Sequence, residues 1–454
     1  MHKFILHTTP REAVRLTEGD PKKVILTFAL PIFLSQLFQQ LYNTADAWIV
    51  GHFLGDDAFA AVSSSGNLIY LFISFFVGAS MGAGVVISRY FGANDLEKVS
   101  RAVHTNVLVS LILGLVLSVC GVLLTPQILV WMNTDPDVLP LSTLYFRCYF
   151  AGSLTVVMYN SLKGVMSAVG DSRRPLWYLI FSSVLNVFLD WLFVGVLGRG
   201  VEWAAIATVI AQTASMFLCL RQLTKKGTVY QLSLKKLRID PAILRQIVHY
   251  GIPTGVQNSV IGLANVLVQS NINTFGAEAM AACGAYSKIE GFAFLPIMSF
   301  SMAMTTYISQ NLGAGEHERV KQGARFGLIT SVFLAELVGV LIYLFAEPFL
   351  TAFVTDPESI RIGVLQCHTE TLFYFLLSFS HCVAGICRGA GKAIVPMFVM
   401  LSVWCVLRII YITVAMHLMH EIVLLFWAYP ITWAISSVIY LIYYKKSNWA
   451  GGFA

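Results

Sequence analysis

Long apolar stretches alternate along the chain with short polar connections. About 20 consecutive apolar residues are enough for a helix to cross the hydrocarbon core of a bilayer. Stretches of this kind lie near residues 22–50, 57–86, 103–125, 140–165, 175–197, 202–223, 244–272, 279–306, 326–346, 362–387, 394–416 and 421–444. The pattern predicts an all-α integral membrane protein with twelve transmembrane helices.

The second half of the chain repeats the first. The segment ISRYFGANDLEKV at 87–99 returns as ISQNLGAGEHERV at 308–320, a shift of 221 positions (308 minus 87). The same shift places the TDP at 134–136 on the TDP at 355–357. Because loop glycines, prolines and acids stay in register, the chain is predicted to be two copies of one six-helix unit.

The predicted organisation is two lobes joined by a charged linker. A cytoplasmic arm covers 1–20, the first lobe 21–223, the linker 224–243, the second lobe 244–446 and a cytoplasmic tail 447–454. Because six spans return the chain to the side where it started, the lobes are expected to be parallel repeats, related by a pseudo-twofold axis along the membrane normal. Such a pair encloses a central cavity that a rocking motion opens to either side.

The distribution of charged residues predicts how the chain is oriented in the membrane. Only 12% of the residues are charged and 57% are hydrophobic, whereas about 25% are charged in soluble domains. Of the 30 Lys and Arg residues, 25 fall in alternate connections on one side of the membrane. Cytoplasmic segments retain these residues, so both termini are predicted to be cytoplasmic, in the plasma (inner) membrane. The net charge of +6 follows from this bias, and no basic face suggests a nucleic-acid partner.

Polar side chains follow one face of the first predicted helix. They recur every three or four residues, which puts them on one side of a helix that cannot face lipid. The residues with this spacing are Gln36, Gln39 or Gln40, Asn43 and Asp46. The matching helix of the second half carries Asn258, Asn265 and Gln269. Both lobes are therefore expected to line an aqueous substrate cavity.

Two further residues are assigned to this cavity. Tyr42 belongs to the first helix, and Glu290 lies in the eighth, two positions after Lys288. Residues two apart point to different sides of a helix, so Glu290 and Lys288 are not an automatic ion pair. Glu290 either offers a negative group to a cationic substrate or pairs with another helix. Other polar residues of the second half are interpreted as structural or close to the membrane surface: Glu336, His368, Glu370 and His381.

Two acids lie inside the predicted spans of the first half. Asp46 is on the first helix and Asp190 on the fifth, with Asn186 one turn earlier; the repeat places Val268 and Tyr411 at the positions of the acids. A carboxylate near the bilayer centre costs about 2.5 to 3.5 kcal/mol on insertion scales, which favours a dedicated site over separate hydrogen bonds within the bundle. Desolvation and a neighbouring carboxylate both favour a protonated acid. The pair is predicted to bind a proton or to hold Na⁺ jointly.

No motif for catalysis or for a bound metal is present. The sequence lacks a Walker loop, HExxH, GxSxG and clustered Cys and His ligands. An enzyme is therefore not expected, and neither is a resident metal or any cofactor besides the coupling ion. The eight cysteines fall in predicted spans without CxxC spacing and are expected to be small packing residues.

Several segments together resemble the MATE (multidrug and toxic compound extrusion) transporters. Beside the two six-helix repeats, they are NTADAWIVGHFLG at 43–55, ISRYFGAND after the second helix, its echo ISQNLGAGE after the eighth, and NVFLD at 186–190. The resemblance covers the chain from about residue 20 to 445. It implies two lobes that meet in a V-shaped central cavity and expel a drug or metabolite in exchange for H⁺ or Na⁺.

The resemblance also assigns residues. The cation site of the family's first lobe falls on Asp46, Asn186 and Asp190, and Thr208 in AIATVIAQ resembles its sixth-helix hydroxyl. Some members carry a further acid in the seventh and tenth helices. Here the seventh helix has none and the tenth offers Glu370, so a second-lobe cation site is not expected.

The leading hypothesis is a secondary active exporter of amphipathic, cationic drugs or metabolites, coupled to H⁺ or Na⁺ by alternating access. We expect a monomer in the bilayer with a small-molecule substrate. A lipid-linked saccharide flippase is the first alternative, but its cavity should be strongly cationic to hold a pyrophosphate, and here Arg147 and Lys288 are the few cations expected inside. An integral-membrane lipid transferase is the second alternative, and no metal-binding spacing supports it.

Overall fold

The computed structural model describes residues 15–54, 56–131 and 139–451, apart from the side chains of 56–72 and Trp131. Most of the predicted arm, the first TDP at 134–136 and the last three residues of the tail lie outside the described residues. All regular structure in the described part of the chain is helical.

The first half crosses the molecule six times. Its helices are α1 (Pro21–Leu54), α2 (Asp56–Gly92), α3 (Leu96–Trp131), α4 (Leu139–Ala151), α5 (Ser153–Ala168), α6 (Arg173–Asp190), the π-helical η1 (Trp191–Val196) and α7 (Val201–Leu223). One crossing is broken at Gly152 into α4 and α5, and another continues from α6 into η1.

The second half repeats this order after a linker that contains η2 (Leu234–Lys236). Its elements are α8 (Pro241–Ile272), η3 (Asn273–Phe275), α9 (Ala277–Gly313), α10 (His317–Leu344), α11 (Ala346–Thr351), α12 (Pro357–Glu370), η4 (Thr371–Phe373), α13 (Tyr374–Gly389), α14 (Ile394–Met400), the π-helical η5 (Leu401–Leu407), α15 (Arg408–Leu418), α16 (Ile422–Lys446) and η6 (Trp449–Gly451). Three of the crossings are composite: α10 runs on into α11, α12 continues through η4 into α13, and α14 continues through η5 into α15.

The predicted twelve-helix, two-lobe fold is confirmed. Ten helical stretches of the described chain are long and apolar enough to span a membrane. The two crossings outside that set are the broken pair α4 and α5, and α8, whose polar residues make it less hydrophobic. These polar residues are the ones that the sequence assigns to a cavity lining.

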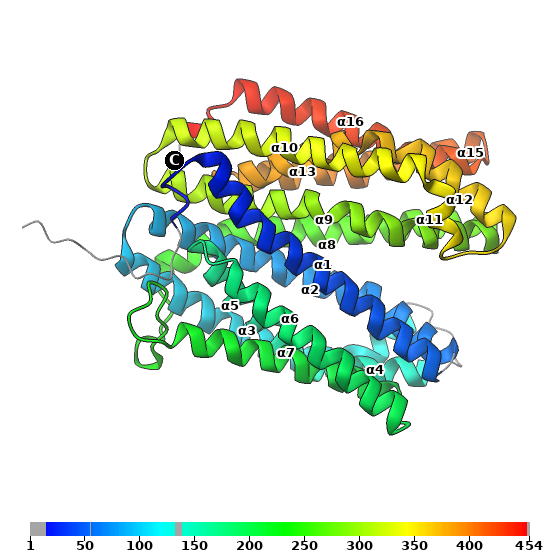
Figure 1. Ribbon diagram of the computed structural model, residues 1–454, viewed down its shortest axis with the longest axis horizontal. Helices are drawn as coiled ribbons and strands as arrows, with labels where there is room; N and C mark the ends of the chain where they lie inside the picture. Colours follow the sequence, from blue (N-terminus) through cyan, green and yellow to red (C-terminus); the bar gives the residue numbers. More distant parts are fainter. Residues whose placement is uncertain (1–14, 55, 132–138, 452–454) are drawn as a thin grey trace, which may run out of the picture.

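The helices form two bundles that lie side by side (Figure 1). We call α1 to α7 the N-lobe and α8 to α16 the C-lobe. Helix α1 begins and α16 ends at the same end of the molecule, on the left of Figure 1, which we call the terminal end. Helices α1 and α7 run obliquely to α10 and α16, so the bundles are not parallel to each other (Figure 1).

Small residues let the lobes touch backbone to backbone in the half of the molecule nearest the terminal end. Helix α2 packs along α8 and α9. In this contact Gly78 and Gly82 of α2 face Gly255 and Gly251 of α8 so closely that a Cβ at either α2 glycine would overlap the α8 backbone. Gly92 faces the backbone of Gln310 in the same way. Because any larger side chain would push the lobes apart, these glycines fix the contact.

Each lobe also lends the start of its first helix to the core of the other. Ile25, Phe28 and Ile32 of α1 belong to a hydrophobic cluster otherwise built from the C-lobe. Reciprocally, Ile243 and Ile247 of α8 lie in the cluster of the N-lobe. Opening the molecule at its terminal end must therefore expose apolar surface from both helices.

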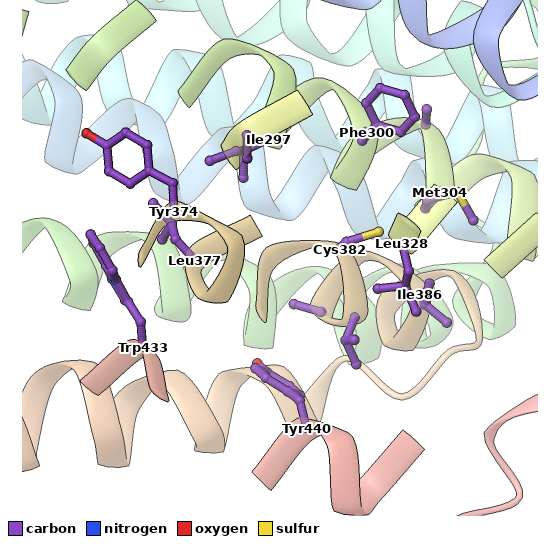
Figure 2. Packing of buried hydrophobic residues seen from close by; sticks show 14 of the residues in the cluster. Ile297, Phe300, Met304, Leu328, Tyr374, Leu377, Cys382, Ile386, Trp433 and Tyr440 are labelled. Atoms are coloured by element: carbon purple, nitrogen blue, oxygen red, sulfur yellow. The ribbon is translucent and has the colours of Figure 1, made fainter. Parts of the chain in front are cut away.

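The C-lobe core is packed by aromatic and branched side chains around α13. Figure 2 shows Leu377, Cys382 and Ile386 of α13 between Met304 of α9 and Tyr440 of α16. The described cysteines are all free. Close packing of this kind makes the C-lobe a stiff unit, so movement is expected at the interface between the lobes.

Candidate functional site

The structure brings Asp46 and Asp190 together in the N-lobe. Asp46 lies on α1, eight residues before its end at Leu54 (54 minus 46), and Asp190 is the last residue of α6 before the π-helical η1. Asp190 is fully buried and Asp46 is half-buried. Their carboxyl groups are close enough for a proton held by one acid to form a hydrogen bond with the other. π-helical turns occur often at functional sites, because they shift one side chain out of the regular register.

Asn186 and Thr208 complete the predicted set. Asn186 lies one turn before Asp190 and its Nδ2 donates to Thr208 Oγ1 at 3.4 Å. Thr208 Oγ1 in turn donates to the backbone carbonyl of Ala204 at 3.2 Å. Both donors of this pair therefore point away from the carboxyl groups, so neither supplies a hydrogen bond to an acid.

The result is a buried group of acceptors without donors. Five oxygen atoms in this region have no hydrogen-bond partner among the described residues: Asp46 Oδ1, Asn186 Oδ1, both oxygens of Asp190, and Gln212 Oε1. A buried polar atom left unpaired costs roughly 1 to 3 kcal/mol. Clustered carboxylate and amide oxygens are hydrogen-bond acceptors and hard-cation ligands, so a proton or a cation would satisfy them.

Tyrosines form the rest of the surroundings. Tyr42 lies one turn before Asp46 on α1, beside Gln212 and near both acids. Tyr145 and Tyr149 of α4 also lie near Asp46, and their rings stack with centroids 6.4 Å apart. The two α4 tyrosines were not predicted. The repeat does contain a signal for them, since the shift of 221 maps them onto Gln366 and Glu370 (145 plus 221, and 149 plus 221).

Two of the predicted cavity residues, Gln36 and Asn258, contact the opposite lobe. Gln36 Nε2 on α1 is 4.0 Å from Met302 Sδ on α9. Asn258 Nδ2 on α8 donates to the backbone carbonyl of Ser74 on α2 at 3.4 Å, so both pairs cross between lobes. The remaining members are partly or fully exposed: Gln39, Asn43 and Asn265. Their role in binding a substrate stays a prediction.

A second buried polar cluster lies in the C-lobe, around Glu370 at the end of α12. Glu370 is 1% exposed. Its Oε2 accepts a hydrogen bond from the hydroxyl of Tyr286 at 3.0 Å, and its Oε1 accepts one from Gln366 Nε2 at 2.9 Å. The hydroxyls of Tyr286 and Tyr374 are 2.9 Å apart. Both carboxyl oxygens of this acid thus have donors from the protein itself.

Arg408 supplies a positive charge to the same cluster. It is the first residue of α15, directly after the π-helical η5, and it is 2% exposed. Its Nε and Nη2 donate to Thr432 Oγ1 at 3.2 and 2.8 Å, and its guanidinium lies 4.3 Å from the ring centroid of Tyr429. Glu290, half-buried on α9, interacts electrostatically with Arg408, as does Glu370. Glu290 was predicted to line the cavity, whereas no role was predicted for Arg408.

The two clusters occupy related places in the repeat. The shift of 221 maps Tyr149 onto Glu370 and Thr208 onto Tyr429 (208 plus 221). It maps Asp190 onto Tyr411, one helical turn after Arg408 (411 minus 408 is three). The fifth crossing therefore carries an acid in the N-lobe and a cation, one turn away, in the C-lobe.

Most of the remaining polar residues of the second half are tied to backbone groups or rings. Glu336 Oε2 accepts from the backbone N–H of Phe375 at 3.1 Å, near the start of α13. His368 lies 3.2 Å from the carbonyl of Tyr343. His381 is buried between the rings of Phe294 and Trp404. In the described residues no group of three or more His, Cys, Asp or Glu side chains is placed to hold a metal ion.

Comparisons with known proteins agree with the internal repeat. A sequence model of the MatE family matches residues 31–192 and 253–414, two segments that are 222 positions apart (253 minus 31, and 414 minus 192). The chain is 28% identical over 426 residues to the probable multidrug resistance protein YoeA of Bacillus subtilis, and the match covers 92% of each protein. It is 26% identical over 402 residues to the probable multidrug resistance protein NorM of Thermotoga maritima, over 87% of this chain and 85% of that protein.

The fold has a counterpart among solved structures. The outward-facing conformation of a multidrug resistance MATE family transporter of the MOP superfamily superposes with a TM-score of 0.90. The match covers 96% of this chain and 98% of that chain at 22% identity. At this identity the likeness establishes the arrangement of helices.

Proposed function

The chain belongs to the MatE family of membrane transporters, and on that premise we propose that it exports amphipathic organic cations in exchange for an inward-moving H⁺ or Na⁺. The terminal end faces the cytoplasm in this proposal. Relatives named as multidrug resistance proteins support export of small molecules.

One observation carries the coupling part of the proposal, namely that five oxygens around Asp46 and Asp190 have no hydrogen-bond partner in the described part of the chain. With both acids ionised and nothing bound, the oxygens repel one another in a buried place. A proton shared by the two carboxyls supplies the missing donor, and Na⁺ supplies the missing positive charge. Either ion stabilises the lobe conformation that closes around it, because an equilibrium shifts toward the state that binds a ligand better.

Exchange requires that the coupling ion and the substrate favour different states. Asp46 shares α1 with Gln36, which contacts Met302 of the other lobe, and with the predicted cavity residues Gln39 and Asn43. A cation bound at the acids and a substrate bound between the lobes therefore act on the same helix. Movement of α1 is the physical link between them in this proposal.

Glu290 supports a cationic substrate. It is half-buried on α9, and Gln40 of α1 lies against the neighbouring Gly291. The carboxyl is therefore close to the surface where α1 of the N-lobe meets α9 of the C-lobe. An amphipathic cation bound there gains a negative partner and apolar contacts at once.

The C-lobe cluster argues for a single coupling site. Glu370 already has two donors and a guanidinium nearby, so it does not require an external cation. One H⁺ inward for one monovalent cation outward moves no net charge. Membrane potential, which is worth about 2.3 kcal/mol per charge per 100 mV, then adds nothing to the driving force.

The test is transport into reconstituted vesicles with pH and sodium gradients imposed separately, using a panel of cationic dyes. Wild-type protein is expected to respond to one of the two gradients and to be insensitive to an imposed potassium diffusion potential. Asp46→Asn is expected to abolish the response, while Glu318→Gln, an exposed acid at the start of α10, retains it. Full gradient-driven transport by Asp46→Asn would refute the coupling site.

A further inference from the structure

The chain enters each lobe through a segment that is fastened to the other lobe. Asp20 precedes Pro21, the first residue of α1, and Asp240 precedes Pro241, the first residue of α8. Just before α8, the backbone N–H of Asp240 donates to Thr105 Oγ1 of α3 at 3.0 Å, and the N–H of Ser233 donates to His104 Nε2 at 3.0 Å. The linker that leads into the C-lobe is thus bound to the N-lobe.

The arm before α1 mirrors this arrangement on the C-lobe. Leu16 is 1% exposed and belongs to the hydrophobic cluster of the C-lobe. Its backbone N–H donates to Gln310 Oε1 at 3.0 Å, and its carbonyl accepts from Asn311 Nδ2 at 3.2 Å and from Arg319 Nη2 at 3.3 Å. Arg319 Nη1 also donates to the carbonyl of Gly19 at 2.7 Å. Side chains of α9 and α10 therefore satisfy the backbone of the arm.

The same few residues join the two lobes directly. Gln310 uses its Nε2 to donate to the carbonyl of Ala168 in the N-lobe at 2.8 Å, while its Oε1 binds the arm. Ser309 Oγ donates to the carbonyl of Val85 on α2 at 2.8 Å. Arg15 donates to Asn94 Oδ1, in the loop between α2 and α3, at 2.7 Å. The arm therefore lies across the line where the lobes meet, with polar contacts on both sides.

These contacts involve residues from the two segments that match each other in the internal repeat. Ser309, Gln310 and Asn311 belong to ISQNLGAGE, and Asn94 belongs to ISRYFGAND. In a transporter that opens alternately to its two sides, this contact has to separate once in each cycle. The linker is covalently continuous with both lobes. The arm is held to the C-lobe by non-covalent contacts alone, so the arm is the segment that can detach.

We propose that residues 15–20 are a latch that holds the lobes together at the terminal end and must detach from Gln310, Asn311 and Arg319 before this end opens. Arg319 is its main fastening, because one guanidinium binds Leu16, Gly19 and Asn311 at the same time. The latch runs directly into α1, the helix that carries Asp46, so the opening of this end and the ion site share one element.

The test measures how often this end opens, using a thiol placed in the contact. Ser309→Cys puts a cysteine at a position that is fully buried while the lobes are closed. In this background we compare Arg319→Gln and Leu16→Ala with Lys321→Gln, a substitution of an exposed cation two residues further along α10. The readout is the rate at which a polar maleimide labels the purified, full-length protein in detergent, after subtraction of labelling in the Ser309 parent.

Arg319→Gln and Leu16→Ala are each expected to raise the labelling rate about tenfold, which corresponds to about 1.4 kcal/mol at 25 °C. Lys321→Gln is expected to leave it unchanged. Unchanged labelling in both latch variants overturns the proposal, and so does an equal rise with Lys321→Gln. Arg319 is only half-buried, so its substitution is not expected to prevent folding. The assay needs no substrate or ion gradient, so its outcome is independent of the proposed exchange reaction.

Discussion

The two lobes derive from one repeated unit but treat buried charge in opposite ways. In the N-lobe, Asp46 and Asp190 face each other with oxygens that have no donor among the described residues. In the C-lobe, Glu370 receives hydrogen bonds from Tyr286 and Gln366 and lies near the guanidinium of Arg408. We propose that a cation completes the first cluster, whereas both carboxyl oxygens of Glu370 in the second already accept hydrogen bonds from the protein.

On the proposed function, this difference explains how a duplicated fold has one cation site in place of two. The lobes must share helix packing, because the same crossings build both cores. The charges need not match, because the C-lobe carries the guanidinium of Arg408, whereas the N-lobe is proposed to bind an external cation. A tethered guanidinium cannot be exchanged across a membrane, so the C-lobe cluster provides rigidity and a fixed charge.

Arg408→Gln is expected to have the largest effect on the difference between the two lobes. Removing the charge partner of a buried group costs about 3 to 5 kcal/mol, so the unfolding temperature should fall sharply and the C-lobe acids should begin to bind an external cation. Arg408→Lys, which keeps the charge, should lose less. Thermal unfolding with and without added Na⁺ measures both effects, and a wild-type transition for Arg408→Gln would contradict the role given to the guanidinium.

A second comparison sets Asp190→Asn against Glu370→Gln. Asp190→Asn removes one of the two carboxylates of the proposed ion site, so gradient-driven transport should fall to background, by more than the roughly ten- to hundredfold of about 1.5 to 3 kcal/mol for one lost hydrogen bond to a charged group. The empty protein should nevertheless be more stable, since a repulsive charge is gone. Glu370→Gln should instead be less stable, because its new amide N–H₂ meets donors from Tyr286 or Gln366.

The Asp190→Asn and Glu370→Gln variants are compared by their transport rates and by their thermal unfolding without Na⁺ at alkaline pH. Equal stability changes of the same sign would remove the distinction between the lobes.

Tyr286→Phe tests the difference between the two lobes at a single hydrogen bond. It removes the donor to Glu370 Oε2 and leaves a buried acceptor unpaired, which costs about 1 to 3 kcal/mol. Tyr411→Phe, at the position equivalent to Asp190, is the matched control and should change stability little. Thermal unfolding of the two variants, run side by side, is the measurement, and an equal loss in both would show that Glu370 does not depend on its donor.

The smallest expected effect is that of Thr208→Ala. It removes the acceptor of Asn186 Nδ2, so the amide is free to turn its donor toward Asp190 and compete with the coupling ion. The affinity for the ion should fall about three- to tenfold, in line with a net 0.5 to 1.5 kcal/mol per hydrogen bond. Thr208→Ser should keep wild-type affinity, measured as the ion concentration for half-maximal transport. Loss of affinity in the serine variant would show that the hydroxyl is not the relevant group.

Much of the fold followed from the sequence because hydrophobic length and repetition are strong signals. A run of apolar residues long enough to cross the bilayer has few alternatives to a helix, and the recurrence of ISRYFGAND as ISQNLGAGE fixed the two-lobe arrangement. The sequence could not show that α1 and α8 each pack into the opposite lobe. That exchange depends on backbone contact at glycines, which a list of apolar stretches does not reveal.

The candidate site followed only in part. Asp46, Asn186, Asp190 and Thr208 were predicted from intramembrane polarity and family resemblance, and the structure brings them together, although their ion-binding role stays a prediction. Glu370 was interpreted as structural or near the surface, and its place in a buried polar cluster became visible only once α9, α12 and α15 were assembled. Contacts between helices far apart in the chain leave no periodic pattern in the sequence.

The most direct test of the central claim is the number of coupling cations bound per protein at equilibrium. Proton uptake in weakly buffered detergent and ²²Na⁺ binding to the same purified protein would count them. The account predicts one bound cation for wild type and for Glu370→Gln, and none for Asp190→Asn. Binding that survives Asp190→Asn and disappears in Glu370→Gln would place the site in the C-lobe and contradict the account.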